Sequence, residues 1–261
     1  NTGADRITTV QLALTAFRLW FSTTFELCGD EAYYRLWSKH LDICYFSKGP
    51  GVAWVIALGT ALFGDHVFGI RFFAVLLSAG TGLLIATLAS RLISTRVTFW
   101  SLGVASLMPF FLAGSVLMTI DPLSVFFWSL AALWFWDAKD DPKPGKWMRT
   151  GMAVGVGVVC KYTNLAELVC FAVFCLCCAE YRRLLARRNF WIMTATALLF
   201  FSPLVIWNYR HDWITWHHLL DRGELDQPLR FSINEFIGFV GEQAGVVSPL
   251  FFIGLLIALC M

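Results

Sequence analysis

The chain has 261 residues, of which 58% are hydrophobic and only 15% are charged. This composition excludes an ordinary soluble domain, whose apolar share is nearer about half, and it predicts an all-α polytopic membrane protein. The formal net charge of +2 is less informative than the placement of the charges, and nucleic acid is not an expected partner.

The first predicted span covers residues 7–27, which as a helix rising ~1.5 Å per residue can cross a hydrocarbon core of ~30 Å. Arg6 precedes it, and cytoplasmic loops collect Lys and Arg, so the helix is predicted to run from inside to outside. Arg18 interrupts the span. The sequence leaves open whether Arg18 snorkels or faces the protein interior, and it favours a structural role over ligand binding.

Two helices are predicted to lie in the membrane interface after this span. Residues 30–42 carry Glu31, Arg35 and Lys39 on one side at helical spacing. The other side holds Tyr33, Leu36, Trp37, His40 and Leu41. Residues 51–63 are apolar but would cover only ~20 Å as a helix, which is short of a bilayer.

The rest of the chain is predicted to cross the membrane back and forth, with basic residues at the inner ends. Spans are expected at residues 68–92, 97–112, 122–136, 190–207 and from 233 onward, and two short helices within 150–180 meet at an outer break, 161–164. Residues 208–230 are predicted to be a polar external loop. About eight crossings follow. Residues 1–261 therefore read as one transmembrane module, whose carboxyl end is expected to be missing because the apolar run 249–261 has no polar stop.

The cysteines divide into two groups. Six lie in apolar runs, where a thiol behaves as a small hydrophobe: Cys160, Cys170, Cys175, Cys177, Cys178 and Cys260. Cys28 and Cys44 share one predicted external loop, which leaves a disulfide open in an oxidising compartment.

Ionisable residues from distant loops gather on the predicted outer side. They are Asp30, Glu31, Lys48, Arg71, Asp121, Lys161, Arg210, His211, Asp212, His217 and His218. Carboxylates can take a proton or hold a metal, and cations can neutralise a phosphate leaving group. These are the requirements of glycosyl transfer from a lipid phosphate.

Several of these residues also have structural explanations. Asp30 could cap the interfacial helix by accepting from the Tyr33 N–H, and Glu31 could pair with Arg35. Asp121 before Pro122 is a favourable helix start, with Asp as N-cap and Pro at the first position. Lys48 and Lys161 could snorkel. The adjacent His217 and His218 are more typical of an interface than of a metal site.

Four motifs occur in the same order as in a known family. They are Asp30-Glu31-Ala32-Tyr33-Tyr34, then Tyr45-Phe46-Ser47-Lys48-Gly49-Pro50 leading to Leu62-Phe63-Gly64, then Thr119-Ile120-Asp121-Pro122-Leu123, then Gly157-Val158-Val159-Cys160-Lys161-Tyr162. In this they resemble the GT-C membrane glycosyltransferases, and most nearly the group of protein O-mannosyltransferases and lipid A aminoarabinose transferases. Gly49 departs from the group, whose members usually have proline there.

The resemblance implies a GT-C-like helical bundle that transfers a sugar from a polyprenyl-phosphate donor to a lipid, glycan or protein acceptor. It implies a bacterial inner membrane location with the site on the periplasmic side. Asp30 would be the catalytic acidic residue, acting as base toward an acceptor hydroxyl or orienting the acceptor, with Asp121 the second acidic residue and Glu31 a supporting one. Lys48 and Lys161 would contact the donor phosphate, and Tyr33, Arg71, Arg210 and His211 are further candidates for substrate binding. The group includes metal-using and metal-free members, so a divalent metal at Asp30 and Glu31 stays open.

Two other functions compete with this one. A transporter or lipid flippase would need charges at midspan, whereas most charges here cluster at the outer surface. A scaffold subunit is the third hypothesis. It would be favoured if Asp30, Lys48, Asp121 and Lys161 did not converge on one place.

Overall fold

The computed structural model describes residues 2–223 and 232–259, and within these ranges every regular element is helical. Cys260 and the end of the predicted polar loop, 224–230, lie outside the described residues. The α-helices are α1 (Thr2–Phe21), α2 (Gly29–Ser38), α3 (Gly51–Phe63), α4 (Val67–Leu92), α5 (Thr95–Leu107), α6 (Pro109–Gly114), α7 (Ile120–Ala138), α8 (Pro144–Cys160), α9 (Ala166–Cys177), α10 (Arg188–Arg210), α11 (Ile214–Arg222), α12 (Ile233–Val247) and α13 (Pro249–Leu259). Two 3₁₀ turns, η1 (Tyr162–Leu165) and η2 (Arg182–Leu184), flank α9.

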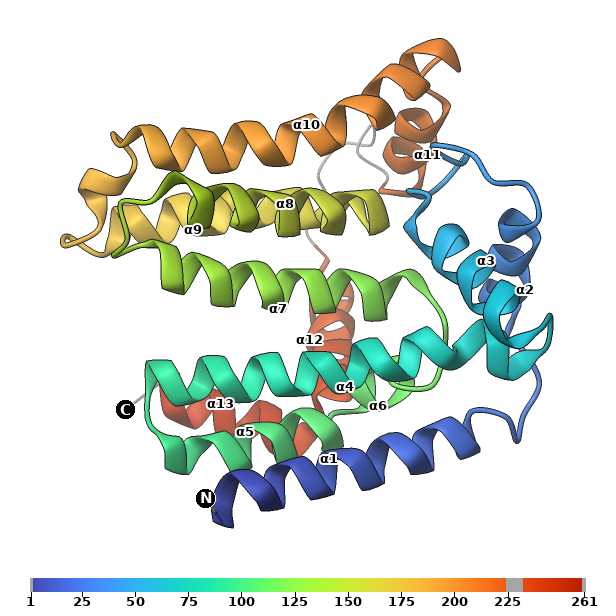
Figure 1. Ribbon diagram of the computed structural model, residues 1–261, viewed down its shortest axis with the longest axis horizontal. Helices are drawn as coiled ribbons and strands as arrows, with labels where there is room; N and C mark the ends of the chain where they lie inside the picture. The colour runs from blue at the N-terminus through green and yellow to red at the C-terminus, as the bar shows by residue number, and fades with distance from the viewer. Residues whose placement is uncertain (1, 224–231, 260–261) are drawn as a thin grey trace.

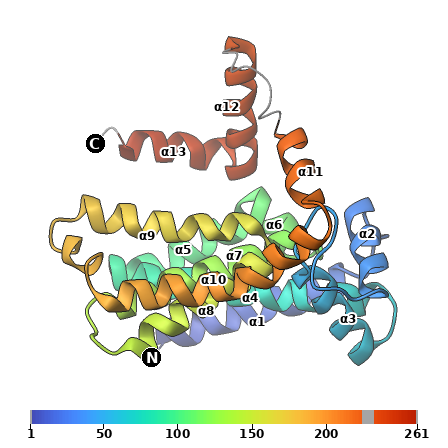
Figure 2. The same cartoon turned by 90° about the horizontal axis from the view of Figure 1, so that it is seen from above.

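The long helices run side by side and the short ones gather at one end of the bundle. In Figure 1, α4, α7, α8 and α10 lie roughly parallel, with α1 and α5 beyond α4, while α2, α3 and α11 group where α1 and α10 end. Figure 2 shows α12 and α13 standing off one side of this layer. The chain therefore presents one end of the bundle built from three short helices and the loops between them.

Two helices, α4 and α10, are each long and apolar enough to cross a membrane. α12 and α13 meet that criterion only as a pair, and they bend by 104° at the break between them. The expected last span is thus not one straight helix in this structure. The number of crossings, about eight, stays a prediction.

Most predicted helices are confirmed, with differences at their ends. The short helix at Gly51–Phe63 and the break at Lys161 occur where the sequence predicted them. α1 ends at Phe21, earlier than expected, where the Ser22, Thr23 and Thr24 hydroxyl groups donate to carbonyls three residues back. Such local bonds compete with continued helix. The predicted loop 208–230 also contains the helix α11.

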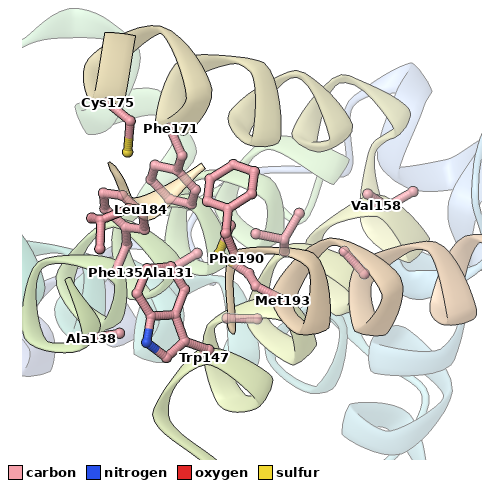
Figure 3. Packing of buried hydrophobic residues seen from close by; sticks show 13 residues of the cluster. Ala131, Phe135, Ala138, Trp147, Val158, Phe171, Cys175, Leu184, Phe190 and Met193 are labelled. Carbon is pink, nitrogen blue, oxygen red and sulfur yellow. The ribbon is translucent and has the colours of Figure 1, made fainter. Parts of the chain in front are cut away.

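The largest apolar core lies between α7, α8, α9 and α10 (Figure 3). Phe135 of α7 stacks on Phe171 of α9 with ring centroids 4.1 Å apart. Trp147 of α8 is buried in the same cluster, and its indole N–H donates to the Asp141 carbonyl (3.0 Å). This core packs α8 against the second half of α7, whereas Asp121 lies at the other end of α7.

Gly151 allows α8 and α10 to approach closely, because a Cβ there would overlap the Met193 carbonyl oxygen of α10. We expect Gly151→Leu to destabilise the protein by about 1–3 kcal/mol through overpacking. Thermal denaturation in detergent measures this. Gly145→Leu in the same helix is the control, since a Cβ at Gly145 meets nothing within 4 Å. Equal melting temperatures for the two variants would contradict the close α8–α10 contact.

Cys28 and Cys44 are free thiols, so the disulfide left open by the sequence does not form. Cys44 is buried, and its Sγ lies 2.9 Å from the Tyr162 hydroxyl oxygen of η1. The contact links the α2–α3 loop to the end of α8.

Candidate active site

Glu31 is completely buried, and its carboxylate connects the start of α2 with α4 and with the loop before α7. Its carboxylate accepts from Arg71 Nε (2.8 Å) and Nη2 (2.6 Å), from the Met118 N–H (2.8 Å) and from the Cys28 N–H (3.1 Å). Burial raises the pKa of this carboxyl, but the Arg71 guanidinium and the two backbone N–H groups outweigh it and hold the pKa below its usual range. Glu31 thus fixes α2 against α4 and the loop before α7.

Arg71 has no exposed surface, and its N–H groups are fully engaged. Besides Glu31, it donates to the Ser22, Phe25 and Glu26 carbonyls at 2.6 to 3.0 Å. Its guanidinium lies 4.0 Å from the Phe25 ring centroid. The structure therefore places Arg71, a predicted substrate-binding residue, in a buried ion pair that fixes the connection between α1 and α2.

The predicted pairing of Glu31 with Arg35 is wrong. Arg35 instead binds Asp65 with two hydrogen bonds of 2.9 Å, and Lys39 joins the same carboxylate. Side chains four residues apart on a helix of 3.6 residues per turn are rotated relative to one another about the helix axis. Glu31 can therefore face the protein while Arg35 and Lys39 face outward.

Asp30 is exposed in the first turn of α2. The residue before the helix is Cys28, and its N–H is bound by the Glu31 carboxylate, so Asp30 does not provide the cap considered from the sequence. Within residues 2–223 and 232–259, no hydrogen bond or ion pair to the Asp30 carboxylate is found. Its carboxylate is available to a ligand.

Asp121 and Lys161 form an ion pair across the ends of two helices. Lys161 Nζ donates to Asp121 Oδ1 at 2.8 Å, and both side chains are about one third exposed. α7 begins at Ile120, and the Thr119 hydroxyl accepts from the Asp121 N–H (3.3 Å), so Thr119 and not Asp121 is the N-cap. Lys161 directly follows α8 in extended conformation.

Lys48 lies half-buried in the α2–α3 loop, among charges of both signs. Burial lowers the pKa of its ammonium group, and Arg222 and Lys161 lower it further, whereas Asp121 and Asp30 act in the opposite direction. Charges act on a pKa through space, so each of these four groups lies in the neighbourhood of Lys48 without forming an ion pair with it. No hydrogen bond or ion pair of the Lys48 ammonium is found in the described part of the chain.

The same charges affect the pKa of Tyr34, which lies on the buried side of α2. Burial, with Asp30 and Asp121, raises the pKa of its hydroxyl to about 12, and Arg222 opposes this. Arg222, in the last turn of α11, therefore lies near this group of charges, and sequence reasoning did not single it out. The sequence does show a polar stretch, 208–230, that contains Arg222. Because this stretch was predicted to be a loop, the residue that α11 directs toward the site could not be identified.

Close backbone contacts bring the Lys48 loop to the end of α8. A Cβ on Gly49 would overlap the Val159 carbonyl oxygen, and one on Gly51 would lie 2.6 Å from Cys160 Sγ. Glycine at 49, where the resembled group has proline, therefore fits the tight contact of this loop with α8. This contact brings the Lys48 loop against the last residues of α8, which Lys161 follows.

Aromatic stacking and hydrogen bonds hold the same loop against α2 and α11. The Tyr45 ring stacks on Trp37 (4.3 Å between centroids), and its hydroxyl donates to the Trp37 and His40 carbonyls at 3.1 and 3.0 Å. Thr215 of α11 donates to the Tyr45 carbonyl (3.2 Å). α11 and its Arg222 are thereby attached to the site.

The remaining predicted residues lie elsewhere or contact other groups. Tyr33 is exposed and packs on Trp37 (4.6 Å between centroids). His211 stacks on Trp207, with Nδ1 2.7 Å from its carbonyl oxygen, and Arg210 is exposed at the end of α10. For neither Arg210 nor His211 does the described structure show a contact with the cluster around Lys48.

Metal ligands do not gather in this region. His218 packs on Phe46 (4.6 Å between centroids). The described residues contain no group of three or more His, Cys, Asp or Glu side chains able to hold a metal ion. The question of metal dependence stays open.

A family model described as dolichyl-phosphate-mannose-protein mannosyltransferase matches residues 47–207, which is more than half of the chain. The chain belongs to this family. The match spans Lys48, Asp121 and Lys161, and ends before α11.

Curated proteins are similar to this chain over much of its length. Lipid A galacturonosyltransferase RgtD of Rhizobium johnstonii is 29% identical over 252 residues, covering 94% of this chain and 52% of that protein. Undecaprenyl phosphate-alpha-4-amino-4-deoxy-L-arabinose arabinosyl transferase of Pseudomonas savastanoi pv. phaseolicola is 29% identical over 225 residues, covering 81% and 38%. The chain thus spans about half the length of the first relative and less of the second.

Solved structures show the same fold. The apo crystal structure of ArnT from Cupriavidus metallidurans superposes with a TM-score of 0.68 at 18% identity, covering 94% of this chain and 49% of ArnT. ArnT bound to undecaprenyl phosphate gives a TM-score of 0.55 at 20% identity, covering 77% and 42%. With the family match and the apolar helices α4 and α10, these findings identify an integral membrane protein with the ArnT fold.

Proposed function

We propose that the full-length protein transfers a sugar from a polyprenyl-phosphate donor to a lipid acceptor. Its place would be the bacterial inner membrane, with the site facing the periplasm. The observation that carries this proposal is the gathering of Asp30, Lys48, Asp121 and Lys161 at one end of the bundle. The names of the similar proteins, which are lipid A and undecaprenyl-phosphate sugar transferases, point to the same chemistry.

Each charged group has a task in such a reaction. The exposed Asp30 carboxylate accepts the proton of the acceptor hydroxyl as its oxygen bonds to the anomeric carbon. The bond from that carbon to the phosphate oxygen breaks, and the charge left on the phosphate is neutralised by Lys48 and Arg222. Asp121 holds the Lys161 ammonium beside them.

A transfer assay tests this function. Purified full-length protein in lipid nanodiscs is mixed with an undecaprenyl-phosphate sugar and lipid A, and mass spectrometry follows the mass of the acceptor. We expect a gain of one sugar residue and release of undecaprenyl phosphate. If none of a panel of galacturonosyl, aminoarabinosyl and hexosyl donors is consumed, the proposal fails.

The pH dependence of donor affinity tests the role of Lys48. Its ammonium is the form that binds phosphate, and its lowered pKa means that the charge is lost at a lower pH than in an ordinary lysine. Affinity should be full at neutral pH and fall as pH rises through this pKa. Lys48→Arg should move the fall to higher pH, because guanidinium stays charged. A control, Lys146→Arg, should keep the wild-type profile, and an unchanged alkaline profile in Lys48→Arg would contradict the assignment.

A further inference from the structure

A large apolar cleft lies away from the Lys48 cluster, between α1, α5 and α6. Its volume is about 740 Å³, within the range of about 300–1,000 Å³ common for ligand pockets. Phe17 of α1, Leu107 of α5 and Leu112 of α6 line it and are themselves strongly exposed. The cleft therefore has an exposed apolar rim, which is typical of a surface that contacts lipid.

Arg18 is the charged residue that lines this cleft, and it is only 5% exposed. Within the described ranges, no carboxylate pairs with it and no hydrogen bond to its guanidinium is found. A second cavity of about 10 Å³ also borders Arg18, together with Gln11, whose Oε1 is buried without a partner. One water there could bridge the two side chains, but it would leave the charge uncompensated.

A buried cation without a counter-ion is costly in an apolar environment, so the cleft is suited to an anion. The planar fork of a guanidinium matches the oxygens of a phosphate, and the apolar walls match a hydrocarbon chain. Arg18 is in the last turn of α1, and the chain leads from there to Asp30. The cation therefore lies toward the end of the bundle that carries the site.

We propose that this cleft binds an anionic glycerophospholipid of the leaflet next to the active site. Its phosphate pairs with Arg18, and an acyl chain lies along the walls formed by α1, α5 and α6. The lipid is bound from the surrounding bilayer and is independent of the transferred sugar and of the Lys48 cluster.

Native mass spectrometry of the full-length protein tests this. Protein in detergent is titrated with phosphatidylglycerol or with phosphatidylcholine of the same acyl chains, and the fraction that retains one lipid is measured. We expect phosphatidylglycerol to be retained at least about tenfold better. Arg18→Gln should lose this preference, since one ion pair of about 1.4 kcal/mol corresponds to that factor. Arg96→Gln, which removes an exposed arginine of α5 outside the cleft, is the matched control.

A second variant covers the case in which Arg18→Gln fails to fold. Gly103 lines the cleft, and a Cβ there meets nothing within 4 Å, so Gly103→Leu should fill the space without disturbing α5. It should reduce phosphatidylglycerol retention as Arg18→Gln does. Inorganic phosphate should not compete with the lipid. Equal retention of the two lipids, unchanged retention in Gly103→Leu, or full competition by inorganic phosphate would overturn the proposal. The first result would also arise if a later segment of the full-length chain fills the cleft.

Discussion

Asp30→Asn is expected to reduce sugar transfer by the full-length protein by about 10²–10⁴-fold, the usual contribution of a general base. Asparagine keeps the shape of the side chain but cannot take the proton of the acceptor hydroxyl. The carboxylate is exposed and makes no hydrogen bond in the described structure, so folding should be unaffected. Initial rates at saturating donor, with melting temperatures alongside, measure both effects.

The matched control is Asp42→Asn. Asp42 is also exposed, at the other end of the segment that contains α2, and its Oδ1 accepts from the Ile43 N–H (2.6 Å), a bond that asparagine can keep. This variant should transfer sugar at the normal rate. Normal turnover by Asp30→Asn would remove Asp30 from the reaction, and a loss shared by both variants would indicate a general effect of charge.

Glu31→Gln is expected to lower the free energy of unfolding by about 3–5 kcal/mol, because it leaves Arg71 buried and unpaired. Both side chains of this ion pair are fully buried, with Oε2 and Nη2 2.6 Å apart. Unfolding in mixed detergent micelles measures the loss. Sugar transfer should fall in proportion to the folded fraction.

An exposed ion pair provides the comparison. Asp65 binds Arg35 and Lys39 at the surface, and its side chain is 38% exposed, so Asp65→Asn should cost at most about 1 kcal/mol. Glu31→Leu combined with Arg71→Leu should recover only part of the loss, because the Ser22, Phe25 and Glu26 carbonyls also lose their donor. Similar costs for Glu31→Gln and Asp65→Asn would contradict a buried structural role for Glu31.

The helical fold could be predicted from the sequence because apolar length and helix breakers act locally. Gly51–Phe63 and the break at Lys161 were recognised on these grounds. The face that each helix buries could not be predicted in this way. Glu31 shares helical spacing with Arg35, but its partner is Arg71, which is forty residues away and itself looked like a ligand-binding residue. Periodicity gives the angle between side chains and not the identity of the neighbouring helix.

The site was predicted unevenly for the same reason. Asp30, Lys48, Asp121 and Lys161 were chosen from motifs and the resemblance, and the structure brings them together at one end of the bundle. Arg222 was missed because α11 was taken for a loop. Its position depends on the contact of Thr215 with the Tyr45 carbonyl, which joins segments distant in sequence.

The central claim is that the cations around Lys48 hold the phosphate of a polyprenyl donor. It is tested most directly by the affinity of the purified full-length protein for undecaprenyl phosphate, measured by calorimetry for the wild type, Lys48→Met and a control, Lys146→Met. Lys146 is a partly exposed lysine near the start of α8, the helix that Lys161 follows, and it pairs with Asp141 rather than with the site. Loss of one charge-assisted contact of about 1.5–3 kcal/mol predicts at least about tenfold weaker binding for Lys48→Met and no change for Lys146→Met. Equal affinity in all three proteins would contradict the account.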